Sequence, residues 1–301
     1  MLAQRTIKNS VSARGVALHS GKISSITFKP AEINTGIVFR RVDLKNKEMK
    51  AHSSLVNEVS LCTSLEKQGM KIATVEHLLS ALSALGIDNL IVEINSEEIP
   101  IMDGSASQFI FLIEAAGIKE QEDYKKFFVI KKEIRVRNGI SWAKVKPFNG
   151  FKIDVEIDFD NKAVKDSGQN LAIDFSKESY LKEISRARTF GYISDIEKMK
   201  SNDLALGASV DNAIGLSENG FLNGQRLRYK NEFVKHKILD VVGDLYLLGG
   251  SLLAEYQGYR VGHALNNILL NEILKDKSNY EVQTFEKDNA PIIFISTDDI
   301  F

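Results

Sequence analysis

One stretch near the C-terminal end constrains the fold of this chain more than any other: residues 233–250, FVKHKILDVVGDLYLLGG. Its apolar residues recur at the three- and four-residue spacing that is typical of one helix face. His236, Asp240 and Asp244 follow one another at intervals of four residues, so they form a second stripe on a different face. Leucines flank this stripe, which indicates that it is not fully exposed to solvent.

A buried row of one imidazole and two carboxylates is costly unless another group pairs with it. A divalent metal is the natural partner for such a set of side chains. The alternative is a solvated acidic face that carries a histidine by chance, and an isolated H-x-x-x-D pattern does not decide between the two. The metal hypothesis therefore requires a third ligand from elsewhere in the chain.

The composition narrows the class of protein. A length of 301 residues suits two modest domains, and the net charge of -1 lacks the basic excess of a nucleic-acid binder. Cys62 is the only cysteine, so the chain has neither a disulfide framework nor a cysteine-based zinc site. The sequence shows no signal core and no apolar run of membrane-spanning length. We expect a monomeric cytoplasmic protein.

The first half reads as strands followed by two helices. A glycine-bounded loop at residues 14–21 carries His19, and Thr74 is a candidate N-cap. Residues 117–126 are polar and lack periodicity, which predicts an interdomain linker. The expected elements are strands at 4–9, 23–28, 36–40 and 89–95 and helices at 75–85 and 106–116.

The second half repeats this order of elements, which indicates a duplication. His77 and His236 lie near the starts of corresponding helices. We predict an α+β fold of two similar domains, residues 1–120 and 127–301, each a mainly antiparallel sheet packed on two helices. An insertion at about residues 190–212 has no counterpart in the first half. The expected elements are strands at 127–136, 142–146, 152–158 and 252–257 and helices at 233–248 and from 264.

Glu76 and His77 lie in the first turn of their predicted helix. The helix dipole disfavours a protonated imidazole there, and a metal ligand must be a neutral imidazole. Together with His236 and Asp240, His77 makes two imidazoles and one carboxylate, a set that suits a catalytic zinc with one open position. Iron(II) remains an alternative for the same ligands.

His263 follows a glycine at the start of the last predicted helix. It is either a capping or core histidine, or a proton donor. Asp244, one turn beyond Asp240, could support a charged ring, because a nearby carboxylate raises the pKa of an imidazole. Hydrolysis of an amide at neutral pH needs a donor for the leaving amine.

Several long motifs resemble one known family. They are GVALHSG, TVEHLLSAL with IDNLIVEI, IPIMDGSA, SRARTFGY, FVKHKILDVVGDL and GHALNN. Together they span essentially the whole chain and are similar to those of the zinc-dependent UDP-3-O-acyl-N-acetylglucosamine deacetylases, which perform the committed step of lipid A synthesis in Gram-negative bacteria. The resemblance implies two domains with the active site at their junction, and removal of an N-acetyl group with release of acetate.

The resemblance also implies roles for individual side chains. It suggests zinc on His77, His236 and Asp240. The other implied roles are Glu76 as general base, His263 with Asp244 as the cation that stabilises the oxyanion or protonates the amine, Thr189 at the oxyanion, Lys237 as a cationic substrate contact, Phe159 and Phe190 near the nucleotide and sugar, and His19 near the metal. Two positions depart from the family pattern: Ser141 replaces a lysine and Ala208 a glycine.

The segment at residues 192–208 places apolar side chains on one helical stripe, with two leucines following in strand-like alternation. Periodicity alone favours a cover for the adjacent sheet, whereas the resemblance implies a hydrophobic passage for an acyl chain that includes Ile196. The substrate would then be taken up at transient contact with a membrane surface. The residues concerned are Tyr192, Ile193, Ile196, Met199, Leu204 and Leu206.

Two other functions remain open from the sequence. One is a non-catalytic two-domain protein held together by a structural metal, but such sites normally have four protein ligands and only three candidates are found here. The other is a metalloamidase that acts on a different N-acetyl sugar with the same chemistry. The free carboxylate of Glu76 beside a ligand favours an enzyme over the structural site.

Overall fold

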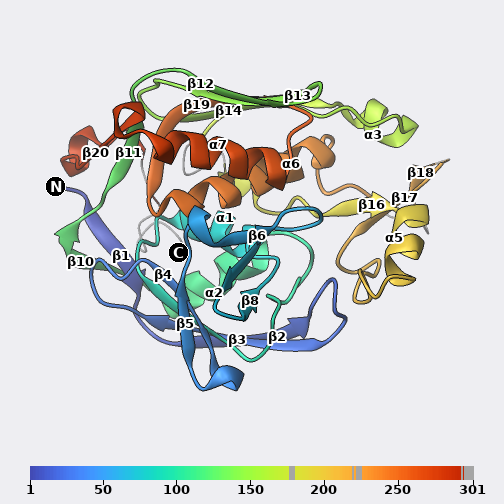
Figure 1. Ribbon diagram of the computed structural model, residues 1–301, viewed down its shortest axis with the longest axis horizontal. Coiled ribbons are helices and arrows are strands. Elements are labelled where there is room, and N and C mark those ends of the chain that lie inside the picture. The colour runs from blue at the N-terminus through green and yellow to red at the C-terminus, as the bar shows by residue number, and fades with distance from the viewer. Residues whose placement is uncertain (176–179, 219, 222–225, 293, 295–301) are drawn as a thin grey trace.

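Two mainly antiparallel sheets enclose a central layer of helices, as the computed structural model shows (Figure 1). The structure describes residues 1–175, 180–218, 220–221, 226–292 and 294. One sheet comes from the first half of the chain and the other from the second. The α+β class predicted from the sequence is confirmed.

The first-half sheet is built around β9. This strand runs antiparallel to β3 and parallel to β4. β2 and β5 extend the sheet as antiparallel neighbours of β3 and β4. In spatial order the strands are β2 (Val11–Val16), β3 (Ile23–Pro30), β9 (Leu90–Ile94), β4 (Ile37–Arg41) and β5 (Lys47–Lys50).

The second-half sheet repeats the pattern around β19. This strand runs antiparallel to β13 and parallel to β14, and the outer neighbours β12 and β15 are again antiparallel. β11 and β20 add to the same sheet. The strands are β12 (Ile134–Asn138), β13 (Ser141–Lys146), β19 (Ser251–Tyr259), β14 (Phe151–Glu156), β15 (Asn170–Asp174), β11 (Phe127–Ile130) and β20 (Tyr280–Gln283).

Three smaller sheets complete the strands of the described residues. They pair β1 (Ala3–Ile7) with β10 (Ile118–Tyr124), join β6 (Val56–Glu58), β7 (Ser64–Lys67) and β8 (Met70–Ile72), and join β16 (Phe190–Tyr192), β17 (Ile214–Ser217) and β18 (Gly220–Phe221). The segment predicted as an interdomain linker, residues 117–126, therefore contains a regular strand that the sequence did not predict. β10 is a regular strand whose polar side chains are mostly exposed, and its backbone pairs with β1.

Four helices form the central layer, and each half of the chain contributes two. All ten residues of α1 are buried, which explains why its sequence, EHLLSALSAL, carries so few charges. Within the described residues, two shorter helices lie in the second half. The helices are α1 (Glu76–Leu85), α2 (Ser107–Ala116), α6 (Glu232–Leu245), α7 (His263–Lys275), α3 (Lys162–Ser167) and α5 (Ile193–Lys200).

Three local predictions need correction. Thr74 does not cap α1: it has a positive φ of 59°, and its hydroxyl donates to Glu98. The strand expected at 127–136 divides into β11 and β12. Leu204 lies in irregular backbone and Leu206 in a turn rather than in a strand, whereas residues 193–200 do form the expected helix.

The contact between α1 and α6 has no room for a side chain at its centre. A Cβ atom built on Gly243 would lie 2.0 Å from the backbone oxygen of Glu76. The hydroxyl of Ser80 also donates to the backbone oxygen of Leu239 across the same contact, at 2.8 Å. The two helices therefore approach closely enough for their side chains to share one site.

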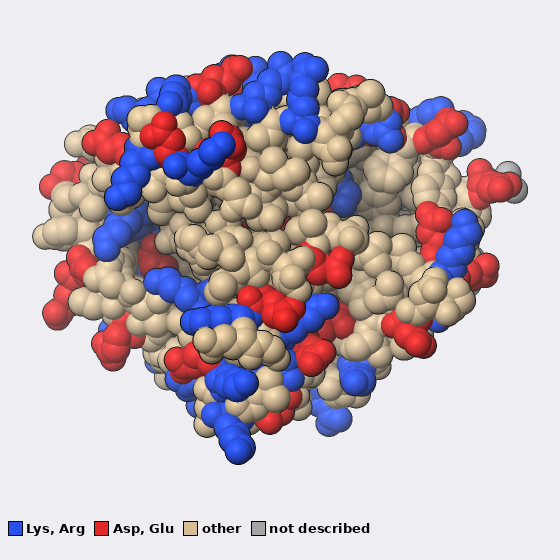
Figure 2. All heavy atoms as spheres, viewed as in Figure 1, with Lys and Arg blue, Asp and Glu red and all other residues tan. Residues whose placement is uncertain are grey.

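The surface in this view carries acidic and basic side chains interspersed, and it is hollowed beside β16 and α5 (Figures 1 and 2). Among the described residues, no helix has the length and apolar character needed to cross a bilayer.

We expect Gly243→Ala to destabilise the protein. In a free helix this change would stabilise by about 1 kcal/mol, but overpacking of a tight contact costs about 1–3 kcal/mol. Urea unfolding of the metal-free protein should therefore show a net loss of up to about 2 kcal/mol in the free energy of unfolding. A gain in stability would show that the helices separate without cost.

Candidate active site

Three buried side chains from α1 and α6 converge on one point. The Nε2 atom of His77 lies 3.6 Å from Oδ1 of Asp240, and the Nε2 atom of His236 lies 3.3 Å from the same oxygen. One ligand atom from each residue lies within 4.8 Å of the others. The α1–α6 contact brings His77 from the first half to the two residues of the second.

The orientation of His236 follows from a backbone contact. Its Nδ1 atom lies 3.0 Å from the backbone oxygen of Ala187, and a carbonyl oxygen can only accept, so Nδ1 carries the proton. Nε2 therefore presents its lone pair toward Asp240. The Oδ2 atom of Asp240 accepts from Lys237 at 2.9 Å, while Oδ1 has no hydrogen-bond donor among the described residues.

The ionisation of the three groups suits a cation. Burial, with the neighbouring His236, lowers the pKa of His77 to about 3, and burial lowers the pKa of His236 as well. Burial would raise the pKa of Asp240, but His236 and Lys237 outweigh it and the pKa falls. Two neutral imidazoles and one carboxylate are the protonation states that metal ligands require.

Glu76 lies beside this group, fully buried in the first turn of α1. Its Oε2 atom accepts from the backbone NH of Thr63 at 3.0 Å, and its Oε1 atom faces Nε2 of His263 at 4.0 Å. Burial raises the pKa of Glu76 well above its usual value. A carboxylate with one anchored oxygen and a raised pKa can accept a proton near neutral pH.

His263 is supported by Asp244 from the opposite side. Its Nδ1 atom lies 2.9 Å from Oδ2 of Asp244, which also accepts from Asn266 at 2.8 Å, while Oδ1 accepts from the Thr63 hydroxyl at 2.6 Å. Burial lowers the pKa of His263, but Asp244 outweighs this effect and the pKa rises to about 10. The ring is therefore a cation at neutral pH.

A cavity of about 220 Å³ lies next to the candidate metal ligands: none of the three lines it, but Lys237, which donates to Asp240, does. All six remaining residues that the sequence singled out lie along it: His19, Phe159, Thr189, Phe190, Ile196 and Lys237. The ring of Phe190 packs against Phe159 at 5.3 Å between centroids and lies 6.2 Å from the ring of His236. Lys237 lies 5.7 Å above the centroid of Phe190, so one wall of the cavity is aromatic and cationic.

His19 also borders a second cavity, of about 630 Å³. Its backbone NH donates to Glu98 at 2.7 Å, and neither ring nitrogen has a hydrogen-bond partner among the described residues. Of the two positions that depart from the resemblance, Ala208 lines the smaller cavity. Ser141 lies in β13 opposite Asn138, outside the lining of both cavities.

The sequence did not point to several residues that orient the site. Thr63 joins Glu76 to Asp244, Asn266 holds Asp244, and the backbone of Ala187 orients His236. Ala187 lies in the motif SRARTFGY and Asn266 in GHALNN, so these motifs marked two of the segments, whereas Thr63 lies outside every motif named above. A backbone oxygen leaves no sequence signal of its own.

Two imidazoles and a carboxylate, with a second carboxylate and a charged imidazole beside them, are typical of metal-dependent hydrolases. The comparison with known proteins agrees with this class. A sequence model of the LpxC family, described as UDP-3-O-acyl N-acetylglycosamine deacetylase, matches residues 4–275. This chain belongs to that family of metalloenzymes.

Three relatives share the name UDP-3-O-acyl-N-acetylglucosamine deacetylase. The protein of Ruthia magnifica subsp. Calyptogena magnifica is 60% identical over 99% of this chain and 98% of its own length. Those of Nitrosococcus oceani and Alcanivorax borkumensis are 51% and 52% identical, each over 98% of both chains. The similarity is therefore end to end.

We expect Asp244→Asn to lower the pKa of His263 from about 10, because Asp244 is the main group that opposes the effect of burial, although Glu76 and Asp240 remain. Nitrogen-15 NMR of the metal-free protein should show His263 protonated throughout pH 6–8 in the wild type and losing its proton at a lower pH in the variant. Asp276→Asn, which removes an exposed carboxylate on another surface, is the control. A wild-type ring that loses its proton near pH 6.5 would contradict this assignment.

Proposed function

We propose that this chain is a zinc-dependent amidohydrolase that removes the N-acetyl group from a UDP-3-O-acyl-N-acetylglucosamine and releases acetate, the committed step of lipid A synthesis. The main support is the His77, His236 and Asp240 group, which lies buried beside Glu76. Lys237, which donates to Asp240, and Phe190, whose ring lies near that of His236, line an aromatic and apolar cavity next to this group. The names of the relatives supply the substrate.

The ligand set fits a resident zinc ion. A buried carboxylate oxygen of Asp240 without a hydrogen-bond donor, facing two imidazole nitrogens, is the arrangement expected where a cation is held. When bound, zinc lowers the pKa of a water molecule toward neutrality and polarises the amide carbonyl. Iron(II) could occupy the same ligands, and metal analysis of the purified protein distinguishes the two.

The reaction then depends on two proton-handling side chains. The Oε1 atom of Glu76 is the oxygen free to take a proton from the attacking water, since Oε2 is held by Thr63. His263, charged and held by Asp244, presents Nε2 to the same space. We assign to it the proton for the leaving amine or the stabilisation of the oxyanion. Thr189, on the cavity wall, would assist at that oxyanion.

Substrate contacts follow from the cavity wall. Lys237 supplies a cation, so it suits a phosphate oxygen of the nucleotide. Phe159 and Phe190 offer ring faces to the nucleotide or sugar. His19 lines the same cavity, so it can contact the nucleotide or the sugar as well. The lysine expected at position 141 is a serine here, so we expect one phosphate contact fewer than in the family pattern.

The insertion is the proposed site of the acyl chain. Ile196 and Met199 of this segment line the cavity, together with Ala208. Leu204 and Leu206 of the same segment are 38% and 45% exposed, so they could touch a membrane surface transiently while the substrate is taken up. The methyl group of Ala208, where the family has a glycine, would narrow this passage.

The proposal also covers organisation and location. It divides the chain into domains at residues 1–120 and 127–301, with the insertion at about residues 190–212, and the repeated strand order supports this division. The protein would act as a monomer in the cytoplasm, and the single buried free cysteine, Cys62, suits a reducing compartment. A purely structural metal is disfavoured because the group has three protein ligands among the described residues.

The direct test incubates the purified holoenzyme with synthetic UDP-3-O-acyl-N-acetylglucosamine and follows acetate loss by mass spectrometry. Glu76→Gln should keep one zinc per chain and lose on the order of 100- to 10,000-fold in rate, because only the base is removed. His236→Ala should lose both the metal and turnover. Wild-type turnover from Glu76→Gln would remove this residue from the mechanism, and an inactive wild-type holoenzyme would contradict the proposed substrate.

A second test addresses the acyl chain. Each buried methylene contributes about 0.8 kcal/mol, so a charge in the passage should weaken binding of a long chain selectively. We expect Ile196→Asp to raise KM for a long-acyl substrate far more than for the same substrate without the acyl group, with zinc content unchanged. Asp195→Asn, a change at the neighbouring cavity residue, serves as the control. Equal effects of Ile196→Asp on both substrates would place the acyl chain elsewhere.

A further inference from the structure

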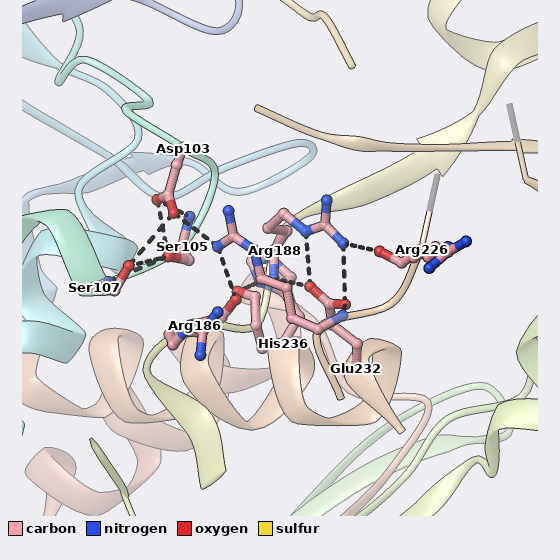
Figure 3. Close-up of polar contacts among 10 residues, drawn as sticks. Asp103, Ser105, Ser107, Arg186, Arg188, Arg226, Glu232 and His236 are labelled. Atoms are coloured by element: carbon pink, nitrogen blue, oxygen red, sulfur yellow. Dashed lines mark hydrogen bonds and ion pairs between the residues drawn. The ribbon is translucent and has the colours of Figure 1, made fainter. Parts of the chain in front are cut away.

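The first turn of α6 carries a fully buried carboxylate outside the site described above. Glu232 accepts from the backbone NH and the Nε atom of Arg188 at 3.0 and 2.9 Å, and from its Nη2 atom at 3.2 Å. It also accepts from the backbone NH of Arg228 at 2.5 Å. Such an arrangement holds both the side chain and the backbone of Arg188 against the helix (Figure 3).

Arg188 lies between two residues that reach the active site. The backbone oxygen of Ala187, on one side, accepts from Nδ1 of the metal ligand His236 at 3.0 Å. Thr189, on the other side, lines the cavity, and its backbone NH donates to Gly104 at 2.8 Å. Any displacement of the Arg188 backbone therefore moves an acceptor of the ligand and a wall of the cavity together.

A second ion pair extends this network to the first half of the chain. The Nη1 atom of Arg228 donates to Asp103 at 2.7 Å and to the backbone oxygen of Arg186 at 3.1 Å. Asp103 in turn accepts from the backbone NH and the hydroxyl of Ser105, at the turn before α2. Figure 3 shows Asp103, Arg188 and Glu232 in one chain of contacts close to His236.

We propose that Glu232 and Arg188 are positioning residues for the metal site: their ion pair fixes the backbone of residues 186–189, and through Ala187 it fixes the tautomer and ring orientation of His236. This inference rests on the proposed metal group. Groups that orient a ligand in this way change metal affinity by about 10- to 100-fold when they are removed. Neither residue lines the cavity, so neither is required to touch the substrate.

The same helix provides a matched control. Lys235, next to His236 in the chain, is also buried and pairs with Glu183 at 2.5 Å. In the part of the chain that the structure describes, neither side chain of this pair forms a hydrogen bond or ion pair with residues 186–189. Lys235 also lies 4.2 Å over the ring of Tyr229. Glu183→Gln therefore removes a carboxylate from a buried cation of α6 without releasing Ala187.

The experiment measures zinc affinity by chelator competition, together with the visible spectrum of the cobalt(II) form. For Glu232→Gln we expect the Kd for zinc to rise about 10- to 100-fold and the cobalt bands to shift, because His236 loses its fixed orientation. Glu183→Gln should match the wild type in both measurements. In steady-state assays at saturating zinc, Glu232→Gln should lower kcat with little change in KM.

Wild-type zinc affinity in Glu232→Gln, or equal weakening in Glu183→Gln, would overturn the proposal and leave a purely structural role for the pair. If Glu232→Gln fails to fold, Arg188→Lys replaces it: a lysine keeps the charge but not the fork of donors, and unchanged zinc affinity would overturn the proposal. A wild-type protein that binds no zinc would overturn the metal site itself, which is a separate outcome.

Discussion

The close contact between α1 and α6 is the constraint on which the site depends. Gly243 lets the backbone of α6 come against the backbone oxygen of Glu76, so residues from two halves of the chain can share a single centre. A side chain at this position would separate the two helices, and His77 would move away from His236 and Asp240. The packing of two helices, rather than a loop, therefore sets the distances between the candidate ligands.

The buried carboxylates around this contact differ in how many hydrogen-bond donors they have, and the difference indicates where a ligand would bind. Asp244 is held by His263, Asn266 and Thr63. Asp240 has a donor on one oxygen only, and Glu76 has one backbone donor. A buried polar atom without a partner is costly unless a ligand or substrate completes it. The least satisfied oxygens of the region thus lie where a cation and a proton would be taken up.

The sequence predicted the parts that follow from periodicity. The stripe of His236, Asp240 and Asp244 lies on one buried helix, and the repeated order of elements corresponds to two sheets of the same strand order. The sequence did not predict the features that depend on backbone hydrogen bonds. The polar strand β10 has no apolar alternation because its side chains face solvent. A pattern of side chains cannot predict the role of the Ala187 backbone oxygen, although this residue lies in the motif SRARTFGY.

The two halves repeat one strand order, yet the centre between them is asymmetric. His77 and His236 lie near the starts of corresponding helices, but the positions four and eight residues later are Ala81 and Leu85 in α1, against Asp240 and Asp244 in α6. Both α1 residues are fully buried. Carboxylates at all four positions would place like charges in one apolar layer and raise one another's pKa. One helix therefore contributes apolar packing beneath its histidine, and the other carries the acidic stripe that a divalent cation needs.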